Sequence, residues 1–471
     1  MVTIGVVIAL YLIISVAIGV YTKGKIKTED DFLAAGGKMG VLVGGLALSA
    51  AQMSVGTSIG TVGFQNAFGY NFSWIWIFIW IAWTVNAFWI GPRLKKFYEK
   101  TGSLTVPEFV AVRYESNFAR SMSALFLLIA FALTIVAELV GIGTIFSVAM
   151  GIPPVYTIIV TAVVFIVYTM FGGQFSVVYT SVFQMIIFLA GFVIAAGFAL
   201  YRVGGLVRMN EALAEIDPSL VAEGMPIGTV MASGLSFGFM MIGYPLVAQR
   251  FFSIRDGKTI RDACGIVIIT QAIMATCVAI MGVSSRVLFN LSSPDDASAT
   301  IAVELLPALL GGLLLAAILA SAQSTASGVL LMIGSAVSHD IVKTQFRPNM
   351  DQKQVLSLSR ICLAVIGLAV IPIAFLELPL IQQIWINAAA IIGSTFAIAL
   401  LFGVCWKRGN SLGGTLSIAL GFLCSTIWML AGNPFGVSCI YLGIGGSLLG
   451  MIVGSLATPP PSEKTVKIFF E

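Results

Sequence analysis

The chain has 471 residues, of which 58% are hydrophobic and only 10% are charged, and its formal net charge is +4 at pH 7. A soluble domain carries about 25% charged residues, so this composition excludes a soluble protein and indicates a polytopic membrane protein. The six cysteines are scattered without metal-ligand spacing, and the small net charge gives no reason to expect a nucleic-acid partner.

Apolar stretches long enough to cross a bilayer follow one another along the whole chain. They lie near residues 2–21, 41–66, 72–92, 121–149, 154–171, 178–202, 225–247, 262–289, 302–336, 355–376, 380–404, 411–432 and 437–457. We therefore expect an all-α protein with about 13 transmembrane helices. The first stretch lacks a basic leader and a cleavage site, so we expect a retained helix rather than a signal peptide.

The basic residues predict an orientation in the membrane. Nearly all Lys and Arg side chains fall in loops on one side, with Arg202, Arg208 and Arg286 as the exceptions. Lys and Arg in short loops favour the cytoplasmic side. We therefore expect a plasma (inner) membrane protein with its N-terminus outside and its C-terminus in the cytoplasm.

The second apolar stretch contains the segment GGLALSAAQMSVGTSIGTVG (44–63), which has five glycines and several small polar residues. Gly and Ser weaken a helix relative to Ala or Leu, and each freed backbone group in lipid needs a partner. One interpretation is close helix packing through small residues. The other is a discontinuous helix whose freed carbonyls bind a cation or a solute at mid-membrane.

Two further segments favour the second interpretation. Residues 315–335 place Ser321, Ser324, Thr325 and Gly328 at positions i, i+3, i+4 and i+7, which is one helical face. Neighbouring hydroxyls there suit a hard cation such as Na⁺. Residues 232–245, ASGLSFGFMMIGYP, form another interruption. Interrupted helices in corresponding positions of two halves indicate an inverted-repeat transporter.

The chain resembles the sodium/solute symporter family, which includes proline, pantothenate, sialic acid and sugar symporters. The resemblance rests on SAAQMSVGTSIGTVG (49–63), TVPEFVAVRY (105–114), MFGGQFSVVYTSVFQ (170–184), GYPLVAQRFFS (243–253) and LAAILASAQSTASGVLLMIGSAVSHD (315–340). It implies a LeuT-type fold of two inverted five-helix repeats. The implied division is an extra helix and cytoplasmic loop (1–40), a first repeat (41–202), an extracellular loop (203–224), a second repeat (225–406), and two helices with a cytoplasmic tail (407–471).

The same resemblance implies a sodium site between core helices 1 and 8. Its implied ligands are the carbonyls of Ala50, Met53 and Ser321 and the hydroxyls of Ser324 and Thr325. By family position, the residues facing the solute are Ser54, Gly56, Thr57 and Ser58. Many members have Asp where this chain has Ser181, and this departure weakens any case for a second sodium ion.

Other candidates for the solute site follow from the residues themselves. Phe237, Met241 and Tyr244 on the second interrupted helix are expected to wall a pocket, and Asn387 is a further candidate. Glu138 is a carboxylate deep inside an apolar span, which makes it a functional hypothesis. It could pair with a substrate amino group, carry a proton, or be a structural acid. The aromatic run at 72–83 is interpreted as an interfacial belt.

Together these observations predict a sodium-coupled symporter that imports a small organic solute by alternating access. An amino acid is favoured, and an organic acid is next. The alternatives are a proton-coupled or uncoupled carrier of the same fold that uses Glu138 and, more remotely, a membrane sensor. No nucleophile, base and metal combine at usable spacing, so we expect no enzyme. We expect a small-molecule substrate, sodium ion, the lipid bilayer and no obligate protein partner.

Overall fold

The computed structural model describes residues 2–23, 35–222, 225–375 and 380–470. Within these ranges the regular elements are helices, and one isolated bridge joins Met39 to Ile254. Eleven helical stretches among the described residues are long and apolar enough to cross a membrane. The expected count of 13 is not reached by these eleven, because Val41–Gln52 and Pro154–Val167 are apolar but shorter. Parts of the expected first cytoplasmic loop (24–34) and of the expected extracellular loop (223–224) lie outside the described residues.

The first half of the chain contains the first interruption, between α3 (Val41–Gln52) and the π-helical turn η2 (Gly56–Thr61). In chain order its helices are α1 (Val2–Lys23), α3, η2, α4 (Val62–Phe68), α5 (Ile75–Val85), η4 (Asn86–Ile90), α6 (Gly91–Thr101), α7 (Val106–Tyr114), α8 (Asn117–Met150), α9 (Pro154–Val203) and α10 (Leu206–Ile216).

The helices of the second half enclose the second interruption and the hydroxyl-bearing helix. They are α11 (Ile227–Gly243), α12 (Pro245–Ser253), α13 (Gly257–Leu288), η6 (Pro294–Asp296), α14 (Ala297–Thr300), α15 (Ala308–Ser335), η8 (Ala336–Phe346), α16 (Gln352–Ala369), α17 (Ile381–Cys405), α18 (Ser411–Leu430), α19 (Cys439–Ala457) and α20 (Glu463–Phe470).

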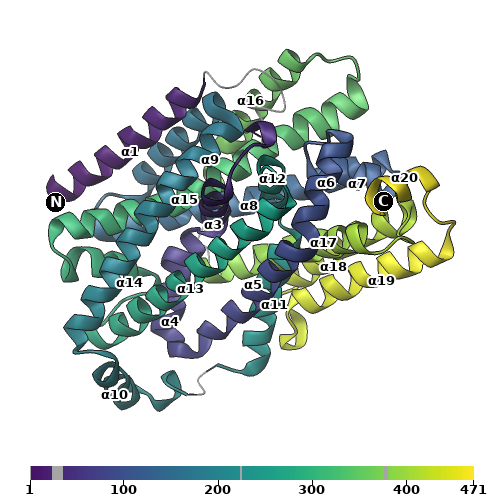
Figure 1. Ribbon diagram of the computed structural model, residues 1–471. Helices are drawn as coiled ribbons and strands as arrows, with labels where there is room; N and C mark the ends of the chain where they lie inside the picture. The colour runs from purple at the N-terminus through teal and green to yellow at the C-terminus, as the bar shows by residue number, and fades with distance from the viewer. Residues whose placement is uncertain (1, 24–34, 223–224, 376–379, 471) are drawn as a thin grey trace.

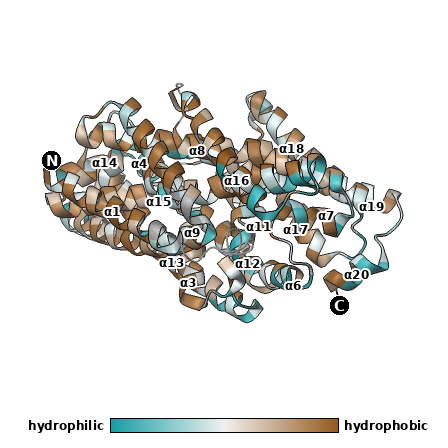
Figure 2. Ribbon diagram, turned by 90° about the horizontal axis from the view of Figure 1, so that it is seen from above, coloured by the Kyte–Doolittle hydropathy of each residue, from teal (hydrophilic) through white to brown (hydrophobic). Residues whose placement is uncertain are grey.

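Short polar side chains begin the helices whose first turns lie in the basic loops. Thr105 caps α7, Ser116 caps α8 and Asp256 caps α13, and each side-chain oxygen accepts a hydrogen bond from the backbone N–H three residues on. These bonds satisfy donors that the first helical turn leaves open. They keep the connections compact. Figure 2 shows hydrophilic residues gathered near α6, α7 and α20, while most other helices are hydrophobic.

Both predicted interruptions are present. The first interruption follows α3, which stops at Gln52. Met53 is extended (φ −81°, ψ 117°), and helical geometry resumes at η2. The second breaks at Tyr244 (φ −73°, ψ 109°), directly before Pro245. A residue that precedes proline is driven out of the helical region, so the Tyr-Pro pair accounts for this break. α9 is also divided, at Gly173 (φ 49°).

The hydroxyl-bearing helix α15 lies inside the bundle. Every residue from Leu314 to Ser335 is buried, and α15 packs against α1, α3, α8 and α9. Figure 1 shows α1 on one flank of the molecule and the paired helices α18 and α19 on the opposite flank. The polar face predicted at Ser321, Ser324 and Thr325 is therefore turned towards other helices rather than towards lipid.

Candidate functional site

The hydroxyl groups of α15 meet the backbone carbonyls at the end of α3. Ser324 Oγ donates to the Ala50 carbonyl at 3.1 Å, and Thr325 Oγ1 donates to the Met53 carbonyl at 3.0 Å. These carbonyls are accessible because α3 ends at Gln52, so no further helical turn covers them; the Ala50 carbonyl also accepts a hydrogen bond from the Met53 N–H at 3.3 Å. All four residues are buried. The break thus brings four neutral oxygen atoms together from two helices.

Ser321 lies one turn before this pair on the same face of α15. Its hydroxyl donates to the Ile318 carbonyl at 2.7 Å and lies 2.9 Å from the hydroxyl of Ser58. Ser58, on η2, therefore faces α15 rather than the cavity described below. The hydroxyl of Ser181, on α9, lies 3.1 Å from that of Ser324. The five residues expected around a sodium ion thus lie in one buried layer between α3 and α15.

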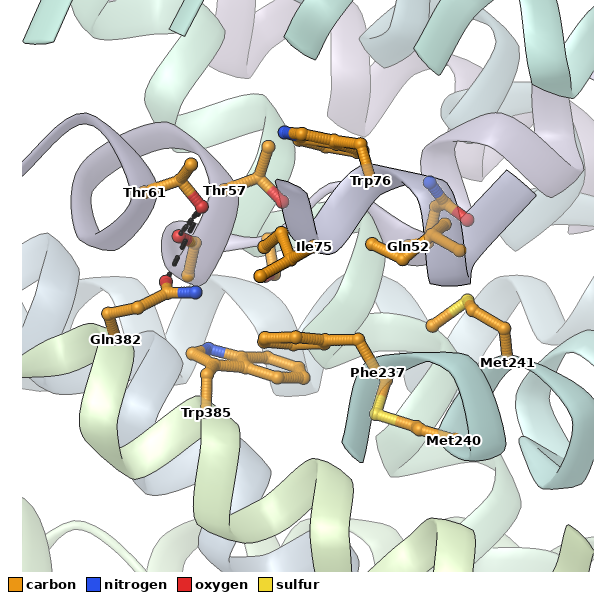
Figure 3. A pocket seen from close by; sticks show the side chains of 13 residues that line it. Gln52, Thr57, Thr61, Ile75, Trp76, Phe237, Met240, Met241, Gln382 and Trp385 are labelled. Carbon is orange, nitrogen blue, oxygen red and sulfur yellow. Dashed lines mark hydrogen bonds between the residues drawn. The ribbon is translucent and has the colours of Figure 1, made fainter. Parts of the chain in front are cut away.

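A small cavity of about 30 Å³ lies on the other side of the broken helix (Figure 3). It is lined by Gln52, Ser54, Gly56, Thr57, Thr61, Ile75, Trp76, Ile79, Phe237, Met240, Met241, Gln382 and Trp385. Figure 3 shows Thr57 and Trp76 facing Phe237 and Trp385 across it. A space of this volume holds about one or two water molecules, so the cavity in this conformation is too small for an organic solute.

The polar groups at the cavity are neutral. Thr61 Oγ1 donates to the Gly56 carbonyl at 3.0 Å and lies 3.5 Å from Gln382 Oε1. The indole N–H groups of Trp76 and Trp385 are buried and have no hydrogen-bond partner among the described residues. The cavity therefore offers hydroxyls, amides and two indole donors, and no charged side chain lines it.

Of the nine residues expected at the solute site, five line the cavity and four do not. Ser54, Gly56, Thr57, Phe237 and Met241 line it, whereas Ser58, Glu138, Tyr244 and Asn387 are absent from its lining.

Glu138 lies behind the break instead. Its Oε2 accepts a hydrogen bond from the backbone N–H of Val55 at 3.2 Å, which is an open donor at the start of the resumed helix. Gly141, one turn further along α8, is in close contact with the same Val55. Glu138 therefore joins α8 to the broken helix.

The other two residues absent from the lining have partners elsewhere. Tyr244 packs edge-on against Phe131, with ring centroids 5.9 Å apart. Asn387 accepts a hydrogen bond from Gln383 at 3.3 Å.

Sequence reasoning missed several lining residues. Gln52 and Thr61 flank the Gly-rich break and were visible as polar residues within a span. Trp76 was missed because the whole aromatic run was assigned to an interfacial belt. The structure exposes only part of that run, since Trp74 is 61% exposed and Trp76 only 4%. Gln382 and Trp385 carried no local signal, because their place at the cavity depends on how α17 packs against η2.

The broken helices, the buried oxygen cluster and the small neutral cavity are the features of a membrane transporter. The sequence model of the Sodium:solute symporter family matches residues 32–421. The chain therefore belongs to this family, and it is a sodium-coupled symporter of a small solute in a multi-pass plasma membrane setting. The expectation of that class from the sequence is confirmed.

Relatives and solved structures agree with this assignment. The chain is 28% identical to the osmoregulated proline transporter OpuE of Bacillus subtilis, covering 98% of this chain and 96% of that one. It is 27% identical to a sodium/proline symporter of Staphylococcus aureus, covering 98% and 93%. A Na⁺-coupled sialic acid symporter, solved in a substrate-bound outward-open state, matches with a TM-score of 0.82 at 21% identity, covering 97% and 98%.

A second solved structure extends the likeness in fold. Mhp1, a nucleobase-cation-symport-1 family transporter in a closed conformation, matches with a TM-score of 0.62 at 15% identity, covering 93% of this chain and 97% of that one. The chain thus has the LeuT-type fold of these transporters.

Proposed function

We propose that the chain uses the sodium gradient to import a small zwitterionic amino acid, and that the ion binds between α3 and α15. The observation that carries the proposal is the convergence of Ser324 and Thr325 on the carbonyls of Ala50 and Met53, at 3.1 and 3.0 Å. Na⁺ is a hard cation that prefers oxygen ligands. Neutral oxygens meet this need without a carboxylate, whose burial in the membrane is costly. The Ser321 carbonyl is the proposed fifth ligand.

The cavity supports a neutral or zwitterionic solute. The buried indole N–H groups of Trp76 and Trp385 and the hydroxyl of Thr57 suit a carboxylate, and the aromatic faces suit an ammonium group. No cationic side chain lines the cavity to hold a large anion. Two relatives are named for proline, so proline is the first solute to test. An organic acid remains the second candidate.

The small volume of the cavity supports coupling by alternating access. A solute larger than water does not fit in about 30 Å³, so the broken helix or its neighbours must move to admit it. One elementary charge crossing 100 mV supplies about 2.3 kcal/mol, which sustains about 50-fold accumulation of a neutral solute.

A proton-coupled carrier that uses Glu138 is the alternative. The hydrogen bond from Val55 to Glu138 favours a structural role for this carboxylate at the break, which weakens the alternative. A membrane sensor is more remote still. The family consists of transporters, so we propose no enzymatic activity, no nucleic-acid partner and no obligate protein partner.

The proposed topology has 13 spans. α3 joins η2 and α4 to form one broken span, α5 to α6 forms the next, and α9 forms two spans that meet at Gly173. This gives one helix before two inverted repeats (41–202 and 225–406) and two helices after them. The N-terminus is proposed to lie outside and the C-terminus in the cytoplasm.

Uptake into proteoliposomes tests the function. Labelled proline, other amino acids and organic acids are offered with and without an inward sodium gradient, to wild type and to the Ser324→Ala/Thr325→Ala variant. We expect sodium-dependent uptake of an amino acid by the wild type and its loss in the double variant. Uptake that ignores both sodium and the double substitution contradicts the proposal and directs attention to Glu138 and protons.

A further inference from the structure

Arg250 is a buried cation next to the proposed sodium site. It lies on α12, directly after the second break, and is 1% exposed. Its Nη1 donates to the Ala47 carbonyl on α3, and its Nη2 donates to the hydroxyl of Ser181 on α9 at 3.2 Å. A charged side chain inside the membrane is expensive and is usually functional. One guanidinium thus ties the inner half of the first broken helix to two other elements.

The hydrogen bonds that start at Arg250 have a fixed direction. A guanidinium has only donors, so Ser181 accepts from Arg250 and its own proton is free to reach Ser324 Oγ, 3.1 Å away. Ser324 in turn donates to the Ala50 carbonyl. The chain of donors therefore runs from Arg250 to two oxygens of the proposed sodium site.

We propose that Arg250 is the positioning residue of the inner gate: it holds α3 closed on the basic side of the molecule and links that closure to sodium binding. The sodium part of this inference rests on the ion site proposed above, whereas the closure does not. α3 cannot swing away from α12 and α9 without breaking the bonds from Arg250 to Ala47 and Ser181. A sodium ion held by Ala50 and Ser324 ties α3 to α15 instead, so it favours the same position of α3 from the opposite contact.

The chain supplies a matched control for Arg250. Arg255 lies five residues later, is 67% exposed and pairs with the neighbouring Asp256 at 2.9 Å. It carries the same charge close by in the chain, but among the described residues its side chain bonds to Asp256 and Thr259 at the start of α13 and not to α3 or α9. A substitution of Arg255 therefore separates the effect of losing a positive charge from the effect of losing the hydrogen bonds from Arg250 to Ala47 and Ser181.

The test measures access of solvent to the surface that α3 covers. Ala263 on α13 is fully buried, and it lies 3.8 Å from where a Cβ on Gly44 of α3 would be. Ala263→Cys is introduced after the six native cysteines are replaced, and its reaction with a membrane-permeant maleimide is followed in the full-length protein. The reaction is measured with and without sodium, in backgrounds carrying Arg250→Gln, Arg250→Lys, Ser181→Ala or Arg255→Gln.

We expect Arg250→Gln to speed the reaction about tenfold or more in sodium-free buffer. The loss of a hydrogen bond from a charged group shifts the equilibrium between the closed and open positions of α3 by at least that factor. Arg250→Lys, which keeps the charge but loses the two-pronged geometry, should fall between wild type and Arg250→Gln. Ser181→Ala should leave the sodium-free rate near that of wild type, because the bond to Ala47 remains, but it should reduce the slowing by sodium.

Equal rates for Arg250→Gln and Arg255→Gln overturn the inference, as does a sodium-free rate for Arg250→Lys equal to that of wild type. If the maleimide reaction of the wild-type background is the same with and without sodium, while Arg250→Gln reacts faster, the result counts against the sodium site and still supports the gate. The same experiment therefore distinguishes failure of the proposed gate from failure of the proposed sodium site.

Discussion

Asp295 shows how a single residue can make the stability of this protein sensitive to pH. It lies in η6 and is 6% exposed, and its Oδ2 accepts a hydrogen bond from the backbone N–H of Ile381 at 3.1 Å. Burial and the charge of the adjacent Asp296 together raise the pKa of Asp295 from 3.8 to about 6, in spite of that bond. The folded protein therefore keeps a proton between pH 4 and 6 that the unfolded chain has already lost.

We predict from this that Asp295→Asn stabilises the protein at neutral pH. Since the native state binds more protons than the unfolded state over this interval, wild type loses stability as pH rises from about 4 to about 6. The neutral amide, which can still accept from Ile381, avoids this loss. Melting temperatures at pH 4.5 and 7.5 should differ more between the two proteins at the higher pH. A difference in melting temperature between wild type and Asp295→Asn that does not change with pH contradicts the prediction. The same pH-dependent difference for the exposed control Asp262→Asn also contradicts it.

Individual residues also show what the sequence could and could not reveal about the site. Ser324 and Thr325 were predictable because helical spacing alone put two hydroxyls on one face. The carbonyl of Met53 has no side-chain signal, and only the family resemblance implied it. Trp385 was invisible, because a tryptophan early in a span has the same local pattern whether it faces lipid or a cavity. The assignment of ligands stays a prediction until sodium binding is measured.

At the level of elements, η2, the part of the first broken helix that follows the break, packs directly on the start of α17. A Cβ added at Gly60 would lie 2.6 Å from Gln382 Oε1 and 2.9 Å from the Gln382 backbone nitrogen. Contacts this short with backbone cannot be relieved by turning a side chain. Gly60 therefore allows the two elements to close over the cavity.

We predict that Gly60→Ala holds these elements apart and lowers the transport rate at least about tenfold, while sodium binding survives because the α3–α15 contact is untouched. Gly197→Ala is the control, since a Cβ there meets nothing within 4 Å. Initial uptake rates and sodium-dependent melting temperatures distinguish the two effects. A Gly60→Ala protein that transports at the wild-type rate shows that this contact does not close the cavity.

The basic end of the hydroxyl-bearing helix is tied to α7 and α8 by a second element-level contact. Asp340 on η8 is fully buried and accepts from Arg120 at 2.9 Å and from Thr105 at 2.8 Å. His339 and Glu108 lie beside this pair, 3.4 Å apart. Hydrogen bonds from His339 and the charges of His339 and Arg120 outweigh burial and lower the pKa of Glu108. The network fixes the C-terminal end of α15, where η8 follows it.

Asp340→Ala is therefore predicted to cost about 3 kcal/mol of unfolding free energy, since it removes the nearer of the two carboxylates that pair with the largely buried Arg120, at 2.9 Å against 3.9 Å for Glu108. Asp262→Ala, which breaks an exposed pair with Arg261 at 3.7 Å, should cost less than about 0.5 kcal/mol. Denaturation in detergent compares the two. Equal losses would mean that the buried network adds nothing to stability.

For the whole molecule, hydropathy and the spacing of small residues were sufficient to predict an all-helical membrane protein with two interrupted helices. Helix boundaries were harder, because α3 is too short and α5 to α6 too continuous for a length criterion to separate them. The orientation rests on loop charge alone and stays a prediction. The cavity could not be predicted as a whole, since its walls come from α5, α11, α17 and η2, which meet only in the folded protein.

Sodium binding by the purified protein tests the central claim most directly. Thr325→Val removes the hydroxyl that donates to Met53 and keeps the shape of the side chain. Thr395→Val is the control, because Thr395 is as deeply buried and its hydroxyl donates, among the residues that the structure describes, to the Ile391 carbonyl of its own helix. We predict that sodium at about 100 times its dissociation constant stabilises wild type and Thr395→Val by about 2.7 kcal/mol, whereas potassium does not. Thr325→Val should need far more sodium for the same effect. Equal stabilisation of all three proteins by sodium would contradict the site between α3 and α15.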